Sequence, residues 1–550
     1  MRCMPYLTKR WTLAFGFFGM IASFLTGYLS AQSTTDWTGS AGNGLWTTST
    51  NWEGNDVPNS LTEIPDFNPA SFVTPGDQIV SIPALTNITV RQVRTTSSDD
   101  VTINGPGTLT FNSDGIGVGM AIADFAEAGG NLTFNTDVSV GFGSTLFIIG
   151  FSSSQSITFN GALDFGSQGL SDNSSAGQIT INGSISGAGR LIASTSRLTT
   201  AVMTITAANS YTGNTLVQRG KLLASGNATF GDGTGLLQIF GPSSSFTPSL
   251  ELSNLTTTTI PNNFTFSGPG EGGNGALQLS AGDATFTGTG TIAGNGGSTT
   301  SIVVASGSTL TFSNTISAGA NNVIEFSGAG DVETSGSGAI LQSSGTTFVT
   351  KEGAGTLTYG GAANTYVGLT TINGGDIVLN STGNSIGNGG LTLNAGTSAS
   401  LGQSNQVGDT ARLTLNGATF NTNGFDESFG PLVLQVSSTF DMGSGDSVIV
   451  FQKNEILGWT AGQTLLVLNW SGNLSGGGTD QLFFGTDSTG LSASKLSQIL
   501  FRNPDGLAIG DYSAQILGTG EVVPVPEPST YALILGAAVI AYILYYRCRK

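Results

Sequence analysis

A short phrase of alternating apolar and polar residues recurs along the chain, in the order apolar, Thr, apolar, Asn. Alternation with a period of two predicts a short β-strand that buries one face and exposes the other. Gly, Asn, Ser and Asp are frequent between the copies and predict turns there. The copies occupy residues 101–104, 109–112, 132–135, 157–160, 179–182, 391–394 and 413–416.

The spacing of these copies indicates how they pack. From Leu109 the steps are 23, 25 and 22 residues, and Leu413 follows Leu391 by 22. A single strand cannot bury its own apolar face, whereas stacked copies can, and a period in the low twenties suits one turn of a β-solenoid. The chain is therefore expected to be all-β, an elongated parallel β-solenoid (β-helix) over residues 76–430, with Thr and Asn ladders between turns.

A longer repeat is offset by 155 residues. The motif Asn-x-Tyr-x-Gly occurs at 209–213 and again at 364–368, and each copy leads into a strand, a Gly turn and a second apolar strand. This pattern resembles the autotransporter-associated β-strand repeat, which is found in passenger-like β-helices. The second copy is close to that pattern, whereas the first departs from it by an insertion before Asn209.

Residues 32–75 contain Trp37, Trp46 and Trp52 within 16 positions. Their arrangement resembles the N-terminal cap that opens many such repeat proteins. Aromatic side chains there would cover the first turn, whose open edge would otherwise invite pairing with another chain. A platform on which carbohydrate stacks is the functional alternative.

The N-terminus has the organisation of an export signal. A basic start is followed by an uncharged apolar run that ends at Leu29-Ser30-Ala31. Residues 1–31 are therefore predicted to be a signal peptide, cleaved after Ala31, with the Sec export machinery and signal peptidase as partners. An uncleaved anchor helix is the alternative, and it would export the rest of the chain equally.

The C-terminus, residues 521–550, has three consecutive parts. Pro526, Glu527 and Pro528 form a stiff extended segment, because each proline fixes its own φ and restrains its predecessor. The run from Tyr531 to Tyr546 is uncharged and long enough, at about 24 Å, for a short transmembrane helix. A basic end follows and is expected to stay in the cytoplasm, with the body outside the inner membrane; its charged residues are Arg547, Arg549 and Lys550.

This tripartite end resembles the PEP-CTERM sorting signal of Gram-negative, biofilm-forming bacteria. The resemblance implies recognition by an exosortase, a membrane transpeptidase, and cleavage near Pro526-Glu527-Pro528. An inner-membrane-tethered intermediate would then reach the cell surface or the medium. A simple single-pass anchor is the alternative. The denser apolar strands of residues 431–520, with a short helical pattern at 491–501, are expected to form a C-terminal β-rich cap.

The charge of the chain makes some partners improbable. Six of its 17 basic residues lie at the two ends, which leaves eleven against 35 acidic residues. Such a body is repelled by nucleic acid, so a nucleic-acid partner is not expected. The chain contains no His, and its only cysteines, Cys3 and Cys548, lie in the targeting segments. Catalysis by Ser-His-Asp or Cys-His, His/Cys zinc sites and haem ligation are therefore not expected.

Any enzyme activity would have to use Asp, Glu, Tyr, Lys or Arg, and pairs of carboxylates are the candidates to weigh. Asp331 and Glu333 lie two apart on a predicted strand, hence on one face and roughly 7 Å apart, a separation that inverting glycosidases use. Other nearby pairs are Asp124 with Glu127 and Asp426 with Glu427. With 35 acidic residues such pairs arise by chance, so we expect no catalytic residue, cofactor or metal.

The sequence thus favours a non-catalytic exported surface protein, a β-solenoid stalk processed by an exosortase-type system. Its expected role lies in extracellular matrix, adhesion or envelope structure. The alternative is a β-helix protein that binds or degrades polysaccharide with carboxylates, so extracellular polysaccharide is a candidate partner.

Overall fold

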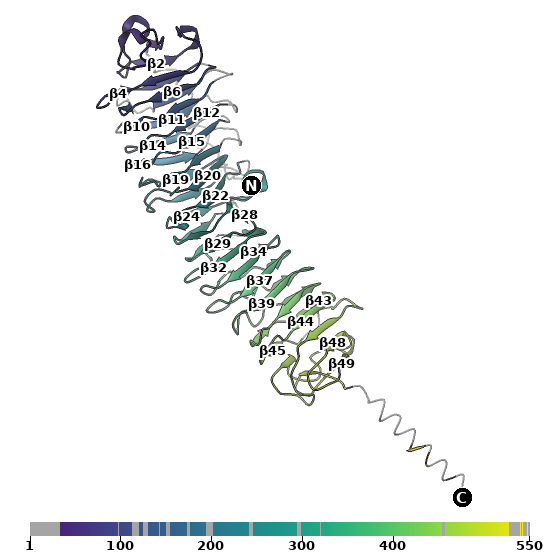
Figure 1. Cartoon of the computed structure of the whole chain (residues 1–550). Helices are drawn as coiled ribbons and strands as arrows, with labels where there is room; N and C mark the ends of the chain where they lie inside the picture. The colour runs from purple at the N-terminus through teal and green to yellow at the C-terminus, as the bar shows by residue number, and fades with distance from the viewer. Residues whose placement is uncertain are drawn as a thin grey trace, which may run out of the picture.

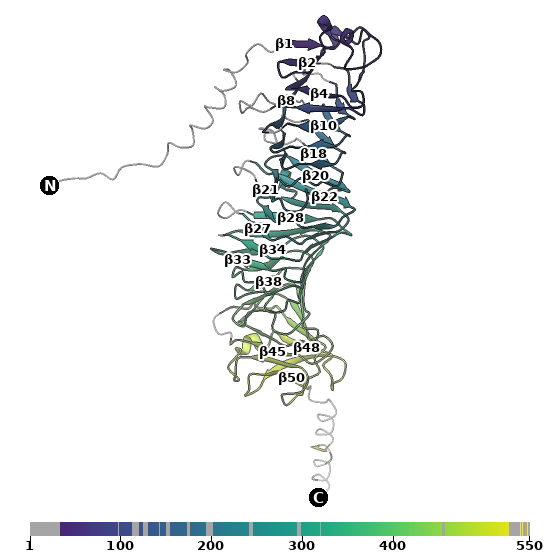
Figure 2. The same ribbon diagram turned by 90° about the vertical axis from the view of Figure 1, so that its left-hand side faces the viewer.

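Strands of two to seven residues stack on one another along a single axis in the computed structural model (Figures 1 and 2). The structure describes residues 33–526 and four residues of the tail, 539, 540, 542 and 547. Within 33–526 it leaves out residues 97, 113–119, 125–129, 142, 150–154, 173–176, 194–201, 241–245, 294–298, 320 and 454–456.

The strands form five sheets, numbered here 1 to 5. Sheet 1 contains β1 (Ser33–Asp36), β2 (Glu63–Phe67), β5 (Gln92–Thr95), β8 (Met120–Asp124), β11 (Thr145–Ile149), β14 (Gly169–Asp172), β17 (Arg190–Ala193), β19 (Thr215–Val217), β21 (Leu237–Ile239), β24 (Phe264–Phe266), β27 (Gly290–Ile292), β30 (Ile316–Ala318) and β33 (Ile340–Gln342). Sheet 2 contains β3 (Gln78–Ser81), β6 (Val101–Asn104), β9 (Leu132–Phe134), β12 (Ser156–Phe159), β15 (Gln178–Ile181), β18 (Val202–Ile205), β20 (Lys221–Gly226), β22 (Ser249–Leu255), β25 (Leu277–Ala281), β28 (Thr299–Val304), β31 (Val323–Gly328), β34 (Phe348–Lys351), β36 (Thr370–Ile372), β38 (Leu391–Leu393), β40 (Leu413–Asn416) and β43 (Leu432–Val436).

The third side of the solenoid is divided between two sheets, and a small fifth sheet lies near the C-terminal end. Sheet 3 contains β4 (Asn87–Val90), β7 (Thr108–Phe111), β10 (Asp137–Val140), β13 (Leu163–Asp164) and β16 (Ile185–Ser186). Sheet 4 contains β23 (Thr259–Ile260), β26 (Ala284–Phe286), β29 (Thr309–Phe312), β32 (Asp331–Thr334), β35 (Thr356–Tyr359), β37 (Asp376–Leu379), β39 (Ser398–Leu401), β41 (Thr419–Asn421), β44 (Ser438–Asp441), β46 (Leu465–Leu468), β48 (Ile499–Arg502), β49 (Asp511–Ile516) and β50 (Val522–Pro524). Sheet 5 contains β42 (Glu427–Phe429), β45 (Val448–Phe451) and β47 (Gln481–Phe484).

Successive turns are joined by parallel, in-register pairing. Ile157 pairs with Leu132 on one side and with Ile179 on the other, so three copies of the repeated phrase lie directly over one another in sheet 2. The step between neighbouring strands of this sheet ranges from 19 residues, Met203 to Leu222, to 31 residues. The predicted all-β parallel solenoid is confirmed.

One predicted step is wrong. The phrase that begins at Leu109 does not lie over the phrase at Leu132, because it forms β7 of sheet 3, where Leu109 pairs with Ile88 and Val138. Leu132 pairs instead with Val101. The error has a physical reason: the phrase specifies a half-buried strand, which suits any side of the solenoid, so equal spacing does not identify which strands are neighbours.

The interior is filled by columns of apolar side chains, one per turn. Phe134 and Phe159 stack with ring centroids 5.0 Å apart and planes within 8° of parallel. Phe420 and Phe440 repeat this arrangement in sheet 4, with centroids 5.4 Å apart. In-register pairing therefore places like rings over like rings, an arrangement that adds to the gain from burial.

Asparagine ladders run along the outside of the same stack. The side-chain amide of Asn135 donates to Asn104 Oδ1 at 2.6 Å, Asn160 donates to Asn135 at 2.7 Å, and Asn182 donates to Asn160 at 2.9 Å. A second ladder lies in the C-terminal half, where Asn416 donates to Asn394 and Asn394 donates to Asn373. These are the Asn ladders that the repeated phrase predicts.

Three tryptophans close the N-terminal end. Trp37, Trp46 and Trp52 are at most 2% exposed and pack around Phe67, with Trp37 and Trp52 in edge contact at 4.9 Å. Their indole N–H groups are used internally: Trp46 donates to Pro58 O at 2.9 Å, and Trp52 donates to Trp46 O at 2.7 Å. The buried rings leave no stacking face for a sugar, which supports the capping interpretation.

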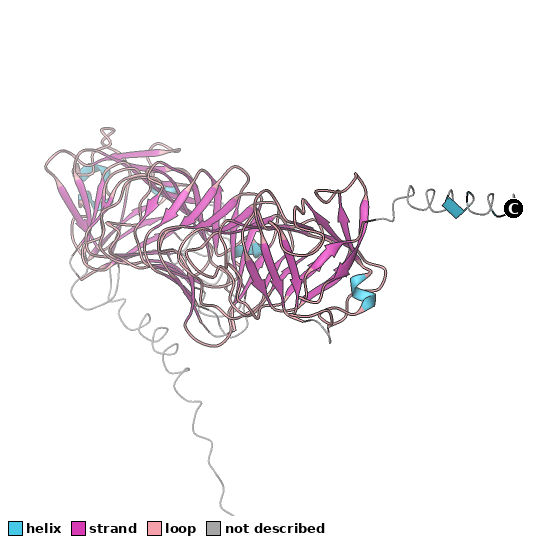
Figure 3. Ribbon diagram, turned by 90° about the horizontal axis from the view of Figure 1, so that it is seen from below, coloured by secondary structure: helices cyan, strands magenta, loops and turns pink. Residues whose placement is uncertain are grey.

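Parallel stacking continues well beyond residue 430. Strand β46 pairs in parallel with β44 and β48, so Leu465 lies between Ser438 and Ile499. The last two strands reverse direction, because β49 pairs antiparallel with both β48 and β50. Residues 431–520 thus hold the last parallel turns and most of an antiparallel closure. The helix expected within 491–501 is shorter than the pattern suggests: it is α2 (Ala493–Leu496), one of the few helical segments in Figure 3.

The predicted targeting segments lie almost wholly outside the described residues. This applies to the signal peptide with Ala31, and to Glu527, Pro528, Arg549 and Lys550. Of the expected transmembrane helix only three residues are described, and they are helical and exposed. Within the part of the chain that the structure describes, no helix has the length and apolar character needed to cross a membrane.

The interior stack makes a direct prediction. We expect Phe159→Ala to lower the free energy of unfolding by about 3–5 kcal/mol, because the missing ring leaves a cavity beneath Phe134. Thr158→Ala, one residue away and on the outer face, is the control and is expected to change it by less than about 0.5 kcal/mol. Urea unfolding followed by circular dichroism measures both, and equal effects would contradict the inward position of Phe159.

Candidate functional site

The Asn-x-Tyr-x-Gly motif ends a sheet in both of its copies. Asn209 accepts the backbone N–H of Ile185, the first residue of β16, at 2.9 Å, and Asn364 accepts that of Ile340, the first residue of β33, at 2.7 Å. These are the last strands of sheets 3 and 1 respectively. The side-chain carboxamide thus accepts the backbone N–H that would otherwise bond to a further strand at this edge of the sheet.

The same carboxamide also holds the following turn. The amide of Asn209 donates to Thr229 O at 2.8 Å, and the amide of Asn364 donates to Ser385 O at 2.7 Å. Each Asn therefore joins the turn before it to the turn after it. The two copies lie on different sides of the solenoid, since their partners belong to sheets 3 and 1, so the 155-residue repeat preserves local contacts but not position around the axis.

The tyrosine and glycine of the motif serve the same junction. Tyr211 and Tyr366 are fully buried, and each hydroxyl lies 2.6 Å from the Thr hydroxyl four residues on. Burial raises the pKa of Tyr211 and that of Tyr366 above the ordinary value of a tyrosine. A Cβ on Gly368 would lie 2.1 Å from Thr347 O, which explains why this position is Gly. The motif is structural, because its polar atoms are satisfied inside the fold.

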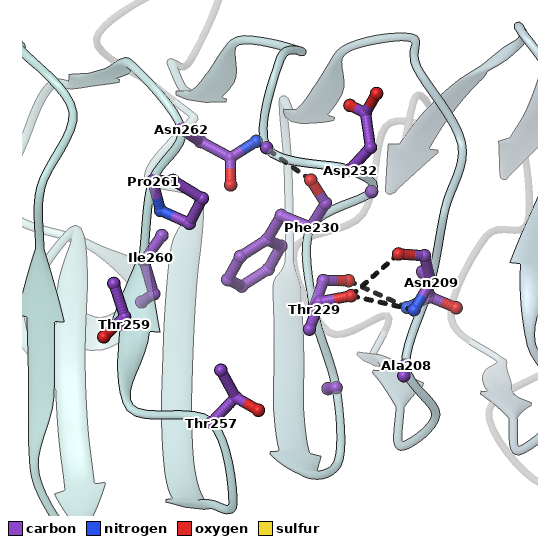
Figure 4. Close-up of a pocket in the computed structure, with 13 residues that line it drawn as sticks. Ala208, Asn209, Thr229, Phe230, Asp232, Thr257, Thr259, Ile260, Pro261 and Asn262 are labelled. Atoms are coloured by element: carbon purple, nitrogen blue, oxygen red, sulfur yellow. Dashed lines mark hydrogen bonds between the residues drawn. The ribbon is translucent and has the colours of Figure 1, made fainter.

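A hollow of about 420 Å³ lies where sheet 3 has ended and sheet 4 begins (Figure 4). Its two amide side chains are already engaged: Asn209 bonds to Thr229, and Asn262 donates to the carbonyls of Phe230 and Gly235. The carboxylate of Asp232 accepts from the hydroxyl and N–H of Thr234, and these bonds lower its pKa. The hollow therefore holds a single carboxylate, which is bound to its own loop.

Of the carboxylate pairs predicted from the sequence, Asp331 and Glu333 lie together on one described face. Asp331 and Glu333 share the outer face of β32, but Asp331 accepts the N–H of Thr356 in the next turn at 2.8 Å. Both lie on a sheet face between rows of threonine, since Glu333 pairs with Thr311 and Thr358. The two acids are thus flanked by threonines on one sheet face, whereas an inverting glycosidase holds its two acids on either side of a bound sugar.

The other two carboxylate pairs give no support for a catalytic site among the described residues. The side chains of Asp124 and Glu127 lie outside the described residues. Asp426 and Glu427 are adjacent and point to opposite sides, so that Asp426 is exposed and Glu427 is only 1% exposed. Among the residues that the structure describes, no group of three His, Cys, Asp or Glu side chains could hold a metal ion.

Many acidic residues have a shared structural task. An Asp just before or at the start of a strand accepts the backbone N–H of the turn that follows: Asp100 from Asn131 at 2.7 Å, Asp137 from Ala162 at 2.8 Å and Asp426 from Val448 at 2.7 Å. Asn131 and Asn263 do the same for Ser156 and Thr289. The excess of acidic residues thus helps to satisfy the backbone at the corners of the solenoid.

A buried polar column at 21-residue steps was not visible in the sequence. It begins at Asn364 and continues through Ser385, whose hydroxyl donates to Gln406 Oε1 at 2.7 Å. It ends at Glu427, whose carboxylate accepts the backbone N–H groups of Gln406, at 2.5 Å, and Val407, at 3.1 Å. Four different residue types occupy the four steps, so no sequence repeat reveals the column.

Lys351 is a second buried charge that the sequence does not reveal. It is 1% exposed and pairs in sheet 2 with Phe326 and Ile372, both buried in the apolar core. Its ammonium donates to the carbonyls of Glu352 at 2.7 Å and Gly353 at 3.0 Å, while burial lowers its pKa. The amine serves the backbone of its own turn.

Comparison with protein-family models, with curated proteins and with solved structures finds no match to this chain. The functional argument therefore rests on the residues and on their geometry.

The end of the polar column predicts a dependence of stability on pH. Burial raises the pKa of Glu427 from 4.5 to about 7 in the folded state, while the unfolded chain keeps the ordinary value. Between these values the folded state holds a proton that the unfolded state lacks, so the contribution of Glu427 to stability is fully present below pH 4.5 and is lost as pH rises through 7. The loss amounts to at most about 3 kcal/mol.

Urea unfolding at acidic and at neutral pH measures this effect. Glu427→Gln should reduce the difference between the two conditions, and Glu333→Gln on the outer face should leave it unchanged. The chain has no His to titrate in this range, and the raised pKa values of Asp66, Glu271 and Glu521 act in the same direction and remain in both variants. An unaltered difference in Glu427→Gln would contradict the assignment.

Proposed function

We propose that this chain is a non-catalytic exported surface protein, whose solenoid is a stalk that an exosortase-type system releases to, or attaches at, the cell surface. A role in extracellular matrix, adhesion or envelope structure follows from that location. The observation that carries the proposal is the continuous solenoid, whose acidic and amide side chains are largely used to join its turns.

The start of the tail is consistent with processing there. Strand β50 is held by antiparallel pairing to β49, and Val525 N donates to Ser513 O at 2.8 Å. Pro526, the next residue, is exposed. An extended, unpaired backbone is what a membrane transpeptidase needs in its active site. The exposed position of Pro526, directly after the last paired residue, supports the proposal that processing occurs there.

A hydrolytic role receives no comparable support. The only predicted pair on one described face, Asp331 and Glu333, lies on a sheet of small polar side chains, and Asp331 is bonded to the next turn. Binding of a polysaccharide without hydrolysis does not require this pair of acids.

Cell fractionation tests the sorting proposal. Replacing Pro526, Glu527 and Pro528 by Ala should leave an unprocessed chain in the inner membrane, because the helix and basic end remain while the cleavage segment is lost. Deleting residues 526–550 should instead release the body without a tether. Mass spectrometry of the wild-type surface material should show that the tail is absent.

A variant with Pro269→Ala and Glu271→Ala is the matched control, since it removes a proline and a glutamate from a turn of the solenoid. It should be processed as the wild type is. Normal processing and surface location of the triple-Ala chain would contradict the proposal.

A further inference from the structure

The N-terminal half of sheet 2 presents a regular outer face of Thr and Asn. Five successive strands place a half-exposed Thr at one outward position, and the residue two further on is Asn in the first four turns and Thr in the fifth. We call this surface the Thr/Asn face, and its members are Thr102, Asn104, Thr133, Asn135, Thr158, Asn160, Thr180, Asn182, Thr204 and Thr206.

The face is pre-ordered along its length. The Asn side chains are fixed by the amide-to-carbonyl bonds of the ladder, which Thr206 closes by donating to Asn182 Oδ1 at 2.9 Å. A carboxamide has two N–H donors and two acceptor lone pairs, and the ladder uses one of each. Each inner Asn therefore still offers one donor and one acceptor, and Asn135, Asn160 and Asn182 are exposed. Binding would cost little further side-chain ordering.

The strands that carry the face are uncharged, although the chain as a whole has a net charge of −18. From β3 to β18 sheet 2 contains no Asp, Glu, Lys or Arg, and the first charges in it are Lys221 and Glu251, which pair at 2.8 Å. An anionic polymer is repelled by the whole chain, whereas a cationic one is drawn to carboxylates such as Asp331 on sheet 4. The charge pattern thus selects a neutral partner for this face.

The repeat of the face selects an extended polymer. Neighbouring strands are about 4.8 Å apart, so each of the first four turns offers the same hydroxyl and amide at that interval along the axis. A β-linked hexose polymer has monomers of similar length, and its hydroxyls both donate and accept. Each contact is worth only about 1 kcal/mol, but contacts on successive turns act together once the first is made.

We propose that the Thr/Asn face binds a neutral β-linked polysaccharide that lies along the solenoid axis. The inference rests on the proposed function as a surface protein and names its partner. The binding needs no catalytic group, and the acids of sheet 4 take no part in it.

Two substitutions within an identical tetrapeptide test the proposal. Leu-Thr-Phe-Asn occurs at 132–135 on the Thr/Asn face and at 109–112 on sheet 3. Thr133→Arg places a long cation in the face, and Thr110→Arg places the same cation on another side. Both outer-face changes should leave the thermal unfolding midpoint nearly unchanged.

The probe is amorphous cellulose, a neutral β-linked glucan, mixed with the full-length protein in a sedimentation assay. Wild type and Thr110→Arg should bind cellulose to the same extent, and the binding of each should not change between low and high salt. Thr133→Arg should bind at least about tenfold more weakly, because the arginine lifts the polymer from several turns at once. Soluble α-linked dextran should not compete. Surface display of Thr133→Arg should match the wild type, so that its failure to bind is separable from any failure of sorting.

Four results would overturn the proposal. They are absence of cellulose binding by the wild type, equal weakening by the two substitutions, preference for cationic chitosan with loss at high salt, and self-association of the chain that Thr133→Arg abolishes. The third would assign binding to the acidic faces, and the last would make a second copy of this chain the occupant.

Discussion

The backbone ladder between successive turns is the interaction on which the rest of this structure depends. Through the solenoid it is parallel and mostly in register, so residues of one strand lie over their counterparts in the turn before. Stacked rings such as Phe134 and Phe159 and the ladder of Asn135 and Asn160 are consequences of that register. Like charges in one column would repel, which fits the chain's 9% content of charged residues.

Such a ladder creates a problem wherever a sheet stops or a corner bends, because backbone groups there lose their partners. The chain solves it with short polar side chains. Asn209 and Asn364 cap the last strands of two sheets, and residues such as Asp137 and Asp331 receive the N–H groups at corners. Many acidic residues are thus committed to the fold, which is why carboxylate pairs in this sequence are poor evidence of catalysis.

The sequence predicts the parts of the fold that repeat in residue type. The phrase with Thr and Asn gave the solenoid and its ladders, because alternation and identity are both visible along the chain. It failed at Leu109, since a half-buried strand does not state which side of the solenoid it occupies. The buried polar column from Asn364 to Glu427 could not be predicted, because its four members differ in residue type and share only the 21-residue step. The burial of Lys351 could not be predicted either, because its neighbours in the stack, Phe326 and Ile372, lie in other turns of the solenoid.

Chemical cross-linking tests the in-register stacking most directly. With Cys3 and Cys548 replaced by Ser, cysteines at Thr133 and Thr158 should form a disulfide on mild oxidation, because paired Cα atoms of neighbouring strands lie about 4.8 Å apart, within the range that a disulfide spans. Cysteines at Thr110 and Thr133, which the spacing of the phrase would pair, should remain reduced because they lie in different sheets. Cross-linking of the second pair but not of the first would contradict the account.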